Sequence, residues 1–142
     1  MRKKRIELPV ELLELEPNSY HLLVAVLING ISGDFIIDTG ASVTVTDSTL
    51  FPGITPIEHN MELQSGSING EISQVQLIPV EKFEIGPYPL NETQIAAIDL
   101  GYVNEMYGKH LNRKITGLLG SDFCVRYNAI IDYRKQTLSL KI

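Results

Sequence analysis

Short runs of apolar residues separated by turn signals fill most of this 142-residue chain. Residues 20–28 form an apolar run rich in Leu and Val. Asn29-Gly30 follows, and both residues tolerate the positive φ angles of a type I′ hairpin turn. Phe35-Ile36-Ile37 then returns as a second apolar strand. Short strands between turns are typical of an all-β barrel or sandwich.

The same pattern predicts further strands and turns along the chain. The predicted strands cover residues 43–46 (half-buried by alternation), 61–64, 71–78, 83–85 and 94–98, and a terminal hairpin of 129–133 and 137–142. Asp47 and Ser48 are suited to capping a single helical turn before Pro52-Gly53 breaks it.

Two stretches depart from the β pattern. Between residues 100 and 112, one helical face is predicted from the spacing of Val103, Met106, Tyr107 and Leu111. Ser121 and Asp122 are candidate caps for a second short helix that reaches residue 127.

The length fits a single domain, residues 1–142, and 44% apolar with 20% charged residues is an ordinary globular composition. A net charge of −5 argues against nucleic acid as the main partner. The basic cluster Arg2-Lys3-Lys4-Arg5 is expected to be a frayed N-terminus, residues 1–5. Residues 22–28 are too short to span a membrane. We therefore expect a soluble, cytoplasmic protein, and leave open a leader that processing removes.

Neither cysteine nor histidine chemistry is indicated. Cys124 is the only cysteine, and its neighbours Phe123 and Val125 suggest a buried thiol and not a reactive one. The histidines lie far apart without ligand spacing, at positions 21, 59 and 110. The sequence therefore predicts no metal site.

Asp38 is the carboxylate with the most unusual setting. It directly follows the apolar residues Ile36 and Ile37, where an unpaired charge is costly. The small residues Thr39-Gly40-Ala41-Ser42 come next, and a glycine lets the backbone turn sharply and aim its N–H at an oxygen. An ordinary Asx turn is the alternative explanation.

A second motif far along the chain favours a functional Asp38 over an ordinary Asx turn. Gly117-Leu118-Leu119-Gly120 is an apolar pair between glycines, with a short predicted helix after it. Together with the hairpin and Asp38-Thr39-Gly40, this order resembles the retropepsin-like aspartic proteases, which include the retroviral enzymes. The resemblance implies a closed acid-protease β-barrel with a flap hairpin and one or two short helices. It also implies aspartic endopeptidase activity without a cofactor.

The resemblance also implies a role for each matching residue. Asp38 would be the catalytic carboxylate, Thr39 would hydrogen-bond across a dimer axis, and Gly40 would offer its N–H to the carboxylate. The remaining positions would support the loop (Ala41, Ser42, Leu118, Leu119 and Gly120) or form the flap over the substrate (Ser65, Gly66, Ser67, Ile68, Asn69 and Gly70).

The proposed chemistry needs two carboxylates, and the chain has a single Asp-Thr/Ser-Gly motif. Asp122 fits helix capping better than a role as the second catalytic carboxylate, because no Thr-Gly follows it. Asp132 is expected to be a surface residue of the last hairpin. The sequence therefore predicts a homodimer that acts on a peptide or protein substrate. The alternative is a peptide-binding or dimerisation module of the same fold with little proteolysis.

Two features depart from the retroviral pattern. A full hairpin follows the last helix, which puts the retroviral dimer interface in doubt. Residues 100–112 are also longer than a retroviral enzyme needs. They could cover the cleft, extend the interface or pack on the barrel, and plain packing is favoured.

Overall fold

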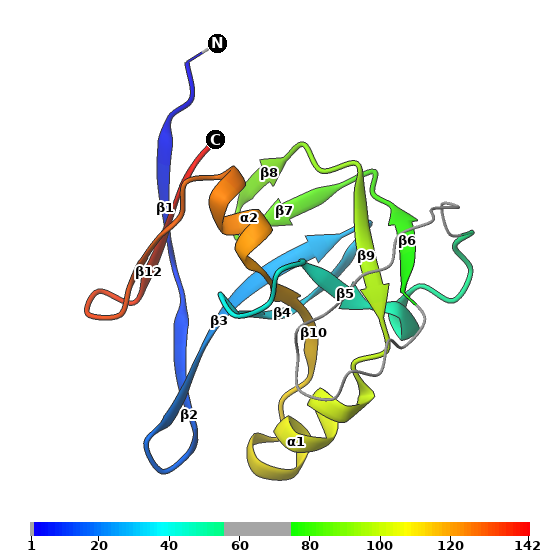
Figure 1. The fold of residues 1–142 in the computed structure, drawn as a ribbon, viewed down its shortest axis with the longest axis vertical. Helices are drawn as coiled ribbons and strands as arrows, with labels where there is room; N and C mark the ends of the chain where they lie inside the picture. Colours follow the sequence, from blue (N-terminus) through cyan, green and yellow to red (C-terminus); the bar gives the residue numbers. More distant parts are fainter. Residues whose placement is uncertain (1, 56–74) are drawn as a thin grey trace.

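The computed structural model describes residues 2–55 and 75–142 (Figure 1). Its strands are β1 (Arg5–Pro9), β2 (Glu11–Glu16), β3 (Ser19–Ile28), β4 (Ile31–Ile37), β5 (Val45–Asp47), β6 (Gln76–Pro79), β7 (Phe83–Ile85), β8 (Tyr88–Leu90), β9 (Gln94–Ile98), β10 (Ile115–Leu119), β11 (Ile130–Asp132) and β12 (Thr137–Lys141). The helices are a 3₁₀ turn, η1 (Ser48–Leu50), and two α-helices, α1 (Gly101–Leu111) and α2 (Ser121–Arg126). The described chain is mostly β with few helices, which agrees with the predicted all-β class and its one or two short helices. No helix in the described ranges has the length and apolar character to cross a membrane.

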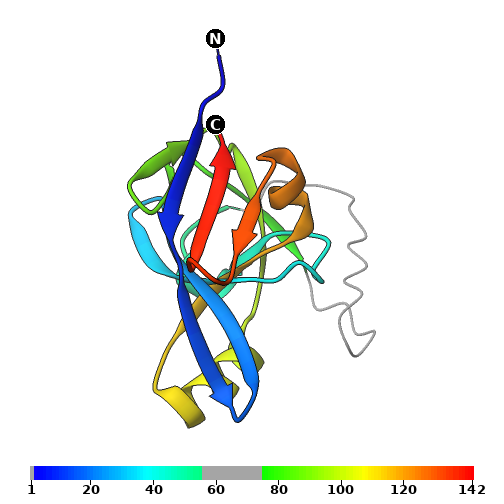
Figure 2. The same ribbon diagram turned by 90° about the vertical axis from the view of Figure 1, so that its left-hand side faces the viewer.

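The strands form two sheets. The larger has the order β6-β9-β5-β10-β4-β3-β7-β8, with β2 also paired to β3. The smaller, in the order β1-β12-β11, joins the two ends of the chain, and Figure 2 shows its three strands side by side. The pairs among the described strands form an open path, so a closed barrel stays a prediction.

The β3–β4 hairpin is the element that the sequence predicts most directly. Asn29 has φ 50° and Gly30 has φ 86°, which are the positive angles that a type I′ turn requires. The Asn29 side chain also accepts a hydrogen bond from Glu81 N–H at 2.8 Å. The turn is therefore set both by local preference and by its contact with the β6–β7 connection.

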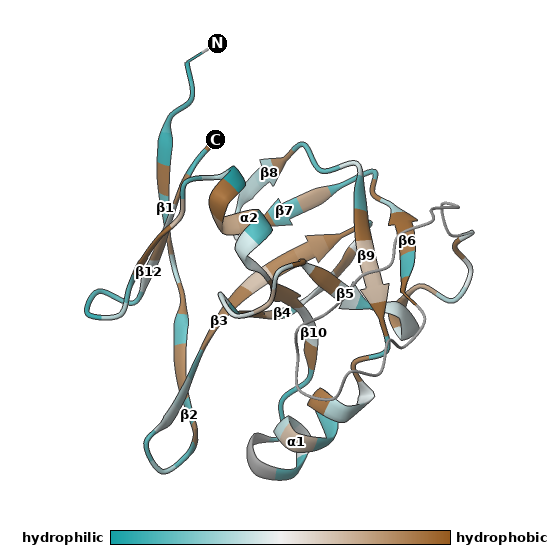
Figure 3. Cartoon of the chain, in the orientation of Figure 1, coloured by the Kyte–Doolittle hydropathy of each residue, from teal (hydrophilic) through white to brown (hydrophobic). Residues whose placement is uncertain are grey.

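Apolar clusters cover both faces of the central strands. Along β4, Phe35 belongs to a cluster shared with the small sheet and α2, whereas Ile36 belongs to one covered by α1. Leu22 and Leu23 divide in the same way along β3. Burial on both faces explains why these segments are continuous apolar runs instead of alternating ones, and Figure 3 shows their concentration in the central strands.

The parallel pair β4–β10 is packed tightly at two glycines. Gly117 pairs with Phe35, and a Cβ on Gly117 would lie 2.2 Å from the Phe35 ring. A Cβ on Gly33 would lie 2.2 Å from the Thr116 hydroxyl oxygen. Side chains larger than hydrogen at these positions would push the two strands apart.

Helix α1 packs on the cluster that contains Leu23 and Ile36. Plain packing was the favoured prediction for residues 100–112. Leu100, Val103 and Tyr107 are buried there, whereas Met106 is 46% exposed, so Met106 does not share the face of Val103 and Tyr107 as the spacing predicted. Just beyond α1, Arg113 donates to Glu11 of β2 at 2.9 and 3.0 Å and to Asp34 of β4 at 3.0 Å. This fork fixes the end of the helix against both strands.

The predicted helix caps are partly right. Asp47 accepts a hydrogen bond from Thr49 N–H at 3.1 Å and is the N-cap of η1, while Ser48 is the first residue of that turn. The N-cap of α2 is Gly120, so Ser121 and Asp122 are wrong as caps. Both lie inside the first turn because the backbone turns into the helix one residue earlier.

The N-terminus differs most from the prediction. Residues 1–5 were expected to fray, but Arg5 opens β1, pairs with Lys141, and donates to the Ser139 hydroxyl at 3.0 Å. Lys4 also exchanges backbone hydrogen bonds with Ile142 at 2.7 and 2.8 Å. The partner strand, β12, lies at the opposite end of the chain. The residues around Arg5 therefore contain no local pattern that predicts the β1–β12 pairing.

Strand β5 and the segment before β6 also differ from the predicted pattern or lie partly outside the described residues. The β5 strand is fully buried and not half-buried, and it lies between β9 and β10 inside the sheet. The predicted strand 61–64, the first half of the predicted strand 71–78 and the flap residues lie outside the described residues. The remainder of 71–78 overlaps β6.

Replacing Gly117 with Ala should destabilise the protein, because the new methyl group collides with Phe35. We expect the free energy of unfolding to fall by about 1–3 kcal/mol, the usual cost of overpacking, as measured by urea denaturation. Gly108→Ala is the matched control, since nothing lies within 4 Å of its Cβ position on α1. It should stabilise the protein by about 0.5–1 kcal/mol through helix propensity. Equal effects of the two changes would contradict the tight β4–β10 contact.

Candidate active site

Asp38 is held at the end of β4 by the neighbouring strand β10. Its N–H donates to the Leu119 carbonyl at 2.8 Å, which continues the parallel β4–β10 ladder beyond Ile37. Its carbonyl accepts from Ala41 N–H at 3.0 Å, which closes a tight turn. The backbone of the candidate catalytic residue is therefore fixed on both sides.

The Asp38 side chain makes one hydrogen bond among the described residues. Gly40 N–H donates to Asp38 Oδ1 at 3.1 Å, which is the contact that the resemblance implied. A Cβ on Gly40 would lie 3.3 Å from the same oxygen, so a larger residue would crowd the carboxylate. Asp38 is half-buried, while Thr39 and Gly40 are exposed. The outer side of the turn is open to solvent in the single chain.

The apolar-Gly motif lies directly beside this turn. Leu118 pairs with Ile36 and Leu119 with Ile37. A Cβ on Gly120 would lie 2.8 Å from the Ala41 carbonyl oxygen, and Ser121 N–H donates to that oxygen at 2.7 Å. The structure thus brings together the residues that the sequence analysis grouped from distant positions. Ser42 is exposed and lies next to this contact.

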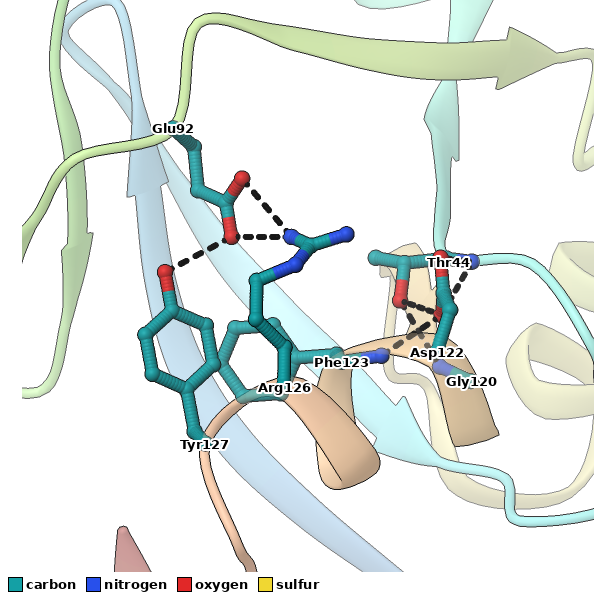
Figure 4. Close-up of polar contacts among 7 residues, drawn as sticks. All are labelled: Thr44, Glu92, Gly120, Asp122, Phe123, Arg126 and Tyr127. Atoms are coloured by element: carbon teal, nitrogen blue, oxygen red, sulfur yellow. Dashed lines mark hydrogen bonds and ion pairs between the residues drawn. The ribbon is translucent and has the colours of Figure 1, made fainter. Parts of the chain in front are cut away.

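Asp122 of α2 holds Thr44, which lies a few residues beyond the Asp38 turn (Figure 4). Its carboxylate accepts hydrogen bonds from the Thr44 hydroxyl at 2.7 Å, Thr44 N–H at 3.0 Å and Phe123 N–H at 2.8 Å. The Thr44 hydroxyl in turn accepts from Gly120 N–H at 3.0 Å. A carboxylate in the first turn of a helix is also favoured by the helix dipole. Asp122 therefore has a structural role, and its carboxylate is occupied away from Asp38.

A cavity beside α2 contains a second polar group but not Asp38. Glu92 accepts from Arg126 at 2.7 Å and from the Tyr127 hydroxyl at 2.8 Å (Figure 4). Burial, and then the Glu92 carboxylate, raise the pKa of Tyr127 to about 12. Arg126 and Glu92 line the cavity together with Asp122 and Phe123. All of its charged groups have partners, so the cavity adds no reactive group.

On the opposite side of the sheet, Tyr107 of α1 packs in the apolar cluster that contains Leu23 and Ile36. Burial raises the pKa of Tyr107 to about 12, and the negative charge of Asp38 adds to the shift. The Tyr107 ring meets the His21 ring edge-on, with centroids 5.7 Å apart. The helical spacing predicted that Tyr107 shares a face with Val103, but gave no sign of its contact with His21. Only the docking of α1 reveals it.

The other candidate groups show no reactive arrangement. Among the described residues, no cluster of three or more His, Cys, Asp or Glu side chains is placed to hold a metal ion. The sequence predicted a buried thiol at Cys124, and the structure shows this residue half-buried. Burial raises the pKa of its thiol. Asp132 accepts from Lys135 N–H at 2.9 Å within the terminal turn. His59 and the flap residues, Ser65 to Gly70, lie outside the described residues.

Comparison with known proteins gives a consistent result. A retropepsin-like aspartic protease from Rickettsia conorii matches 99% of this chain and 94% of its own, with a TM-score of 0.56 and 16% sequence identity. At that identity the match establishes a similar fold. No curated protein matches the chain.

The family comparison covers the motifs described above. The family model described as aspartyl protease matches residues 24–123, a range that contains Asp38 and the Leu118-Leu119-Gly120 segment beside it. The match covers more than half of the chain. The chain therefore belongs to the aspartyl protease family, and its fold is of the retropepsin-like type.

Proposed function

We propose that this protein is an aspartic endopeptidase that acts as a homodimer, with one Asp38 from each chain. The observation that carries the proposal is the geometry of Asp38. The carboxylate is anchored by Gly40 N–H at 3.1 Å, on a turn locked to β10 from behind and exposed at Thr39 and Gly40 in front. A second copy has access to the exposed front of this turn.

The single motif explains why two copies are needed. Two carboxyl groups that share a site at about 3 Å cannot both be ionised, so one keeps its proton. The ionised Asp38 takes a proton from a water molecule, whose oxygen attacks the scissile carbonyl carbon. The protonated Asp38 gives its proton to the carbonyl oxygen, which forms a neutral tetrahedral diol. When the diol collapses, the C–N bond breaks and the leaving amine receives a proton from the pair.

The remaining site residues have supporting roles in this proposal. Thr39 hydrogen-bonds across the dimer axis, Ala41 and Ser42 complete the turn, and Leu118, Leu119 and Gly120 hold it from behind. The closed barrel, the flap formed by Ser65 to Gly70, the single-domain organisation and an extended peptide substrate belong to the same proposal. None of these steps requires a cofactor.

Asp38→Asn should abolish proteolysis, because the amide can neither accept the proton of the water nor donate an acidic one. We expect kcat/KM on a peptide library, between about pH 4 and 7, to fall by at least about 10²- to 10⁴-fold. Glu81→Gln is the matched control, since it removes an exposed carboxylate in the β6–β7 connection and should leave cleavage unchanged. Cleavage that persists in Asp38→Asn would overturn the proposal. A wild-type dimer that binds peptides without cutting them would favour the binding module.

Thr39→Ala should weaken the dimer, because the twofold axis counts each lost hydrogen bond twice. With about 0.5–1.5 kcal/mol per bond, the dimer dissociation constant should rise by roughly 5- to 150-fold in sedimentation equilibrium. Thr93→Ala removes another exposed hydroxyl and should leave the dissociation constant at the wild-type value. An unchanged dimer in Thr39→Ala would contradict a role for this hydroxyl at the axis.

A further inference from the structure

The Tyr107 hydroxyl is an unexplained polar group in an apolar cluster. Tyr107 is 2% exposed, and its Oη is the one buried side-chain N or O atom without a hydrogen-bond partner among the described residues. Leaving such a group unpaired costs about 1–3 kcal/mol, and buried tyrosine hydroxyls usually find partners. Phenylalanine would fill the same space without this cost. The hydroxyl therefore calls for a functional explanation.

Strand register places Asp38 on the same face as Tyr107. The β3–β4 ladder pairs Leu23 with Ile36, and both side chains belong to the cluster that contains Tyr107. Side chains alternate along a strand, and the β10 ladder keeps the backbone in line as far as Asp38 N–H. Continued by two residues, the register sets His21 opposite Asp38 on this face.

The contacts of helix α1 place Tyr107 beside His21, the residue that the register sets opposite Asp38. The Tyr107 ring lies edge-on to His21, at 5.7 Å between centroids and 71° between planes. Burial, and then the negative charge of Asp38, raise the pKa of Tyr107. Because that pKa is about 12, the hydroxyl keeps its proton at neutral and acidic pH and can act as a donor.

We propose that Tyr107 is a positioning residue for Asp38, with its hydroxyl linked to the Asp38 carboxylate through a bridging water. The inference rests on the proposed function, in which Asp38 activates the attacking water. The bridging water accepts from Tyr107 and donates to the carboxylate oxygen that Gly40 N–H leaves free. Bridging waters of this kind bind nearly as well as direct hydrogen bonds. The bond orients the carboxylate from the buried side, so the exposed side is free for the second chain and the substrate.

Tyr107→Phe tests the inference because it removes only the hydroxyl. We expect kcat for peptide cleavage to fall by about tenfold, the effect of one lost hydrogen bond, with KM within twofold of the wild-type value. Tyr102→Phe is the matched control on the same helix, since Tyr102 is 60% exposed, and it should leave both constants unchanged. Wild-type kcat in Tyr107→Phe would overturn the inference while leaving the proposed function intact.

A double-mutant cycle by thermal unfolding gives a second readout that does not require activity. If the hydroxyl is linked to Asp38, Tyr107→Phe should lower the melting temperature by about 3–5 °C in the wild-type background, because it removes a hydrogen bond. In the Asp38→Ala background the hydroxyl has lost its partner, so Tyr107→Phe should no longer lower the melting temperature and should leave it unchanged or raise it. Equal shifts in both backgrounds would overturn the inference. If the wild-type protein cleaves no peptide, the proposed function fails, and the cycle still decides whether the two side chains are coupled.

Discussion

The close parallel contact between β4 and β10 is the constraint on which the rest of the structure depends. Glycine at position 117 lets the Phe35 ring lie against the β10 backbone, where a Cβ would sit 2.2 Å from it. The same ladder then holds Asp38 N–H on the Leu119 carbonyl and brings Gly120 beneath Ala41. If these strands moved apart, the turn that carries the carboxylate would lose its support.

This contact also explains how a carboxylate is kept at the edge of two apolar clusters. Neighbouring β4 residues face opposite clusters, Phe35 toward α2 and Ile36 toward α1, so an alternating backbone directs Asp38 toward the α1 side. A charge at such a place is tolerated only when polar partners surround it. Gly40 N–H supplies one of them. The structure therefore combines apolar support from behind with one hydrogen bond to the Asp38 carboxylate among the described residues.

The sequence predicted those features that local chemistry determines. Asn29-Gly30 specifies its turn through positive φ angles, and helix α1 follows from its apolar spacing, although Met106 turned out to be exposed. The Leu118-Leu119-Gly120 segment beside the Asp38 turn was expected from the resemblance, but other features that depend on distant partners were missed. Strand β1 is ordered by β12 at the other end of the chain, and no local pattern near Arg5 encodes that pairing. Near Asp38, the hydrogen bond from Gly40 N–H was expected from the resemblance, whereas the position of Tyr107 depends on how α1 docks.

The hydrogen-bonding capacity of Asp38 connects these observations to the proposed chemistry. An ionised carboxylate has about four acceptor positions, and the described residues fill one of them. In the proposed dimer the others are divided by direction. The second Asp38 and the attacking water approach from the exposed side of Thr39 and Gly40, and Tyr107 acts from the buried side. Because the two directions do not compete, the buried hydroxyl can orient the carboxylate without blocking the substrate, which gives a reason to retain a tyrosine where phenylalanine would pack equally well.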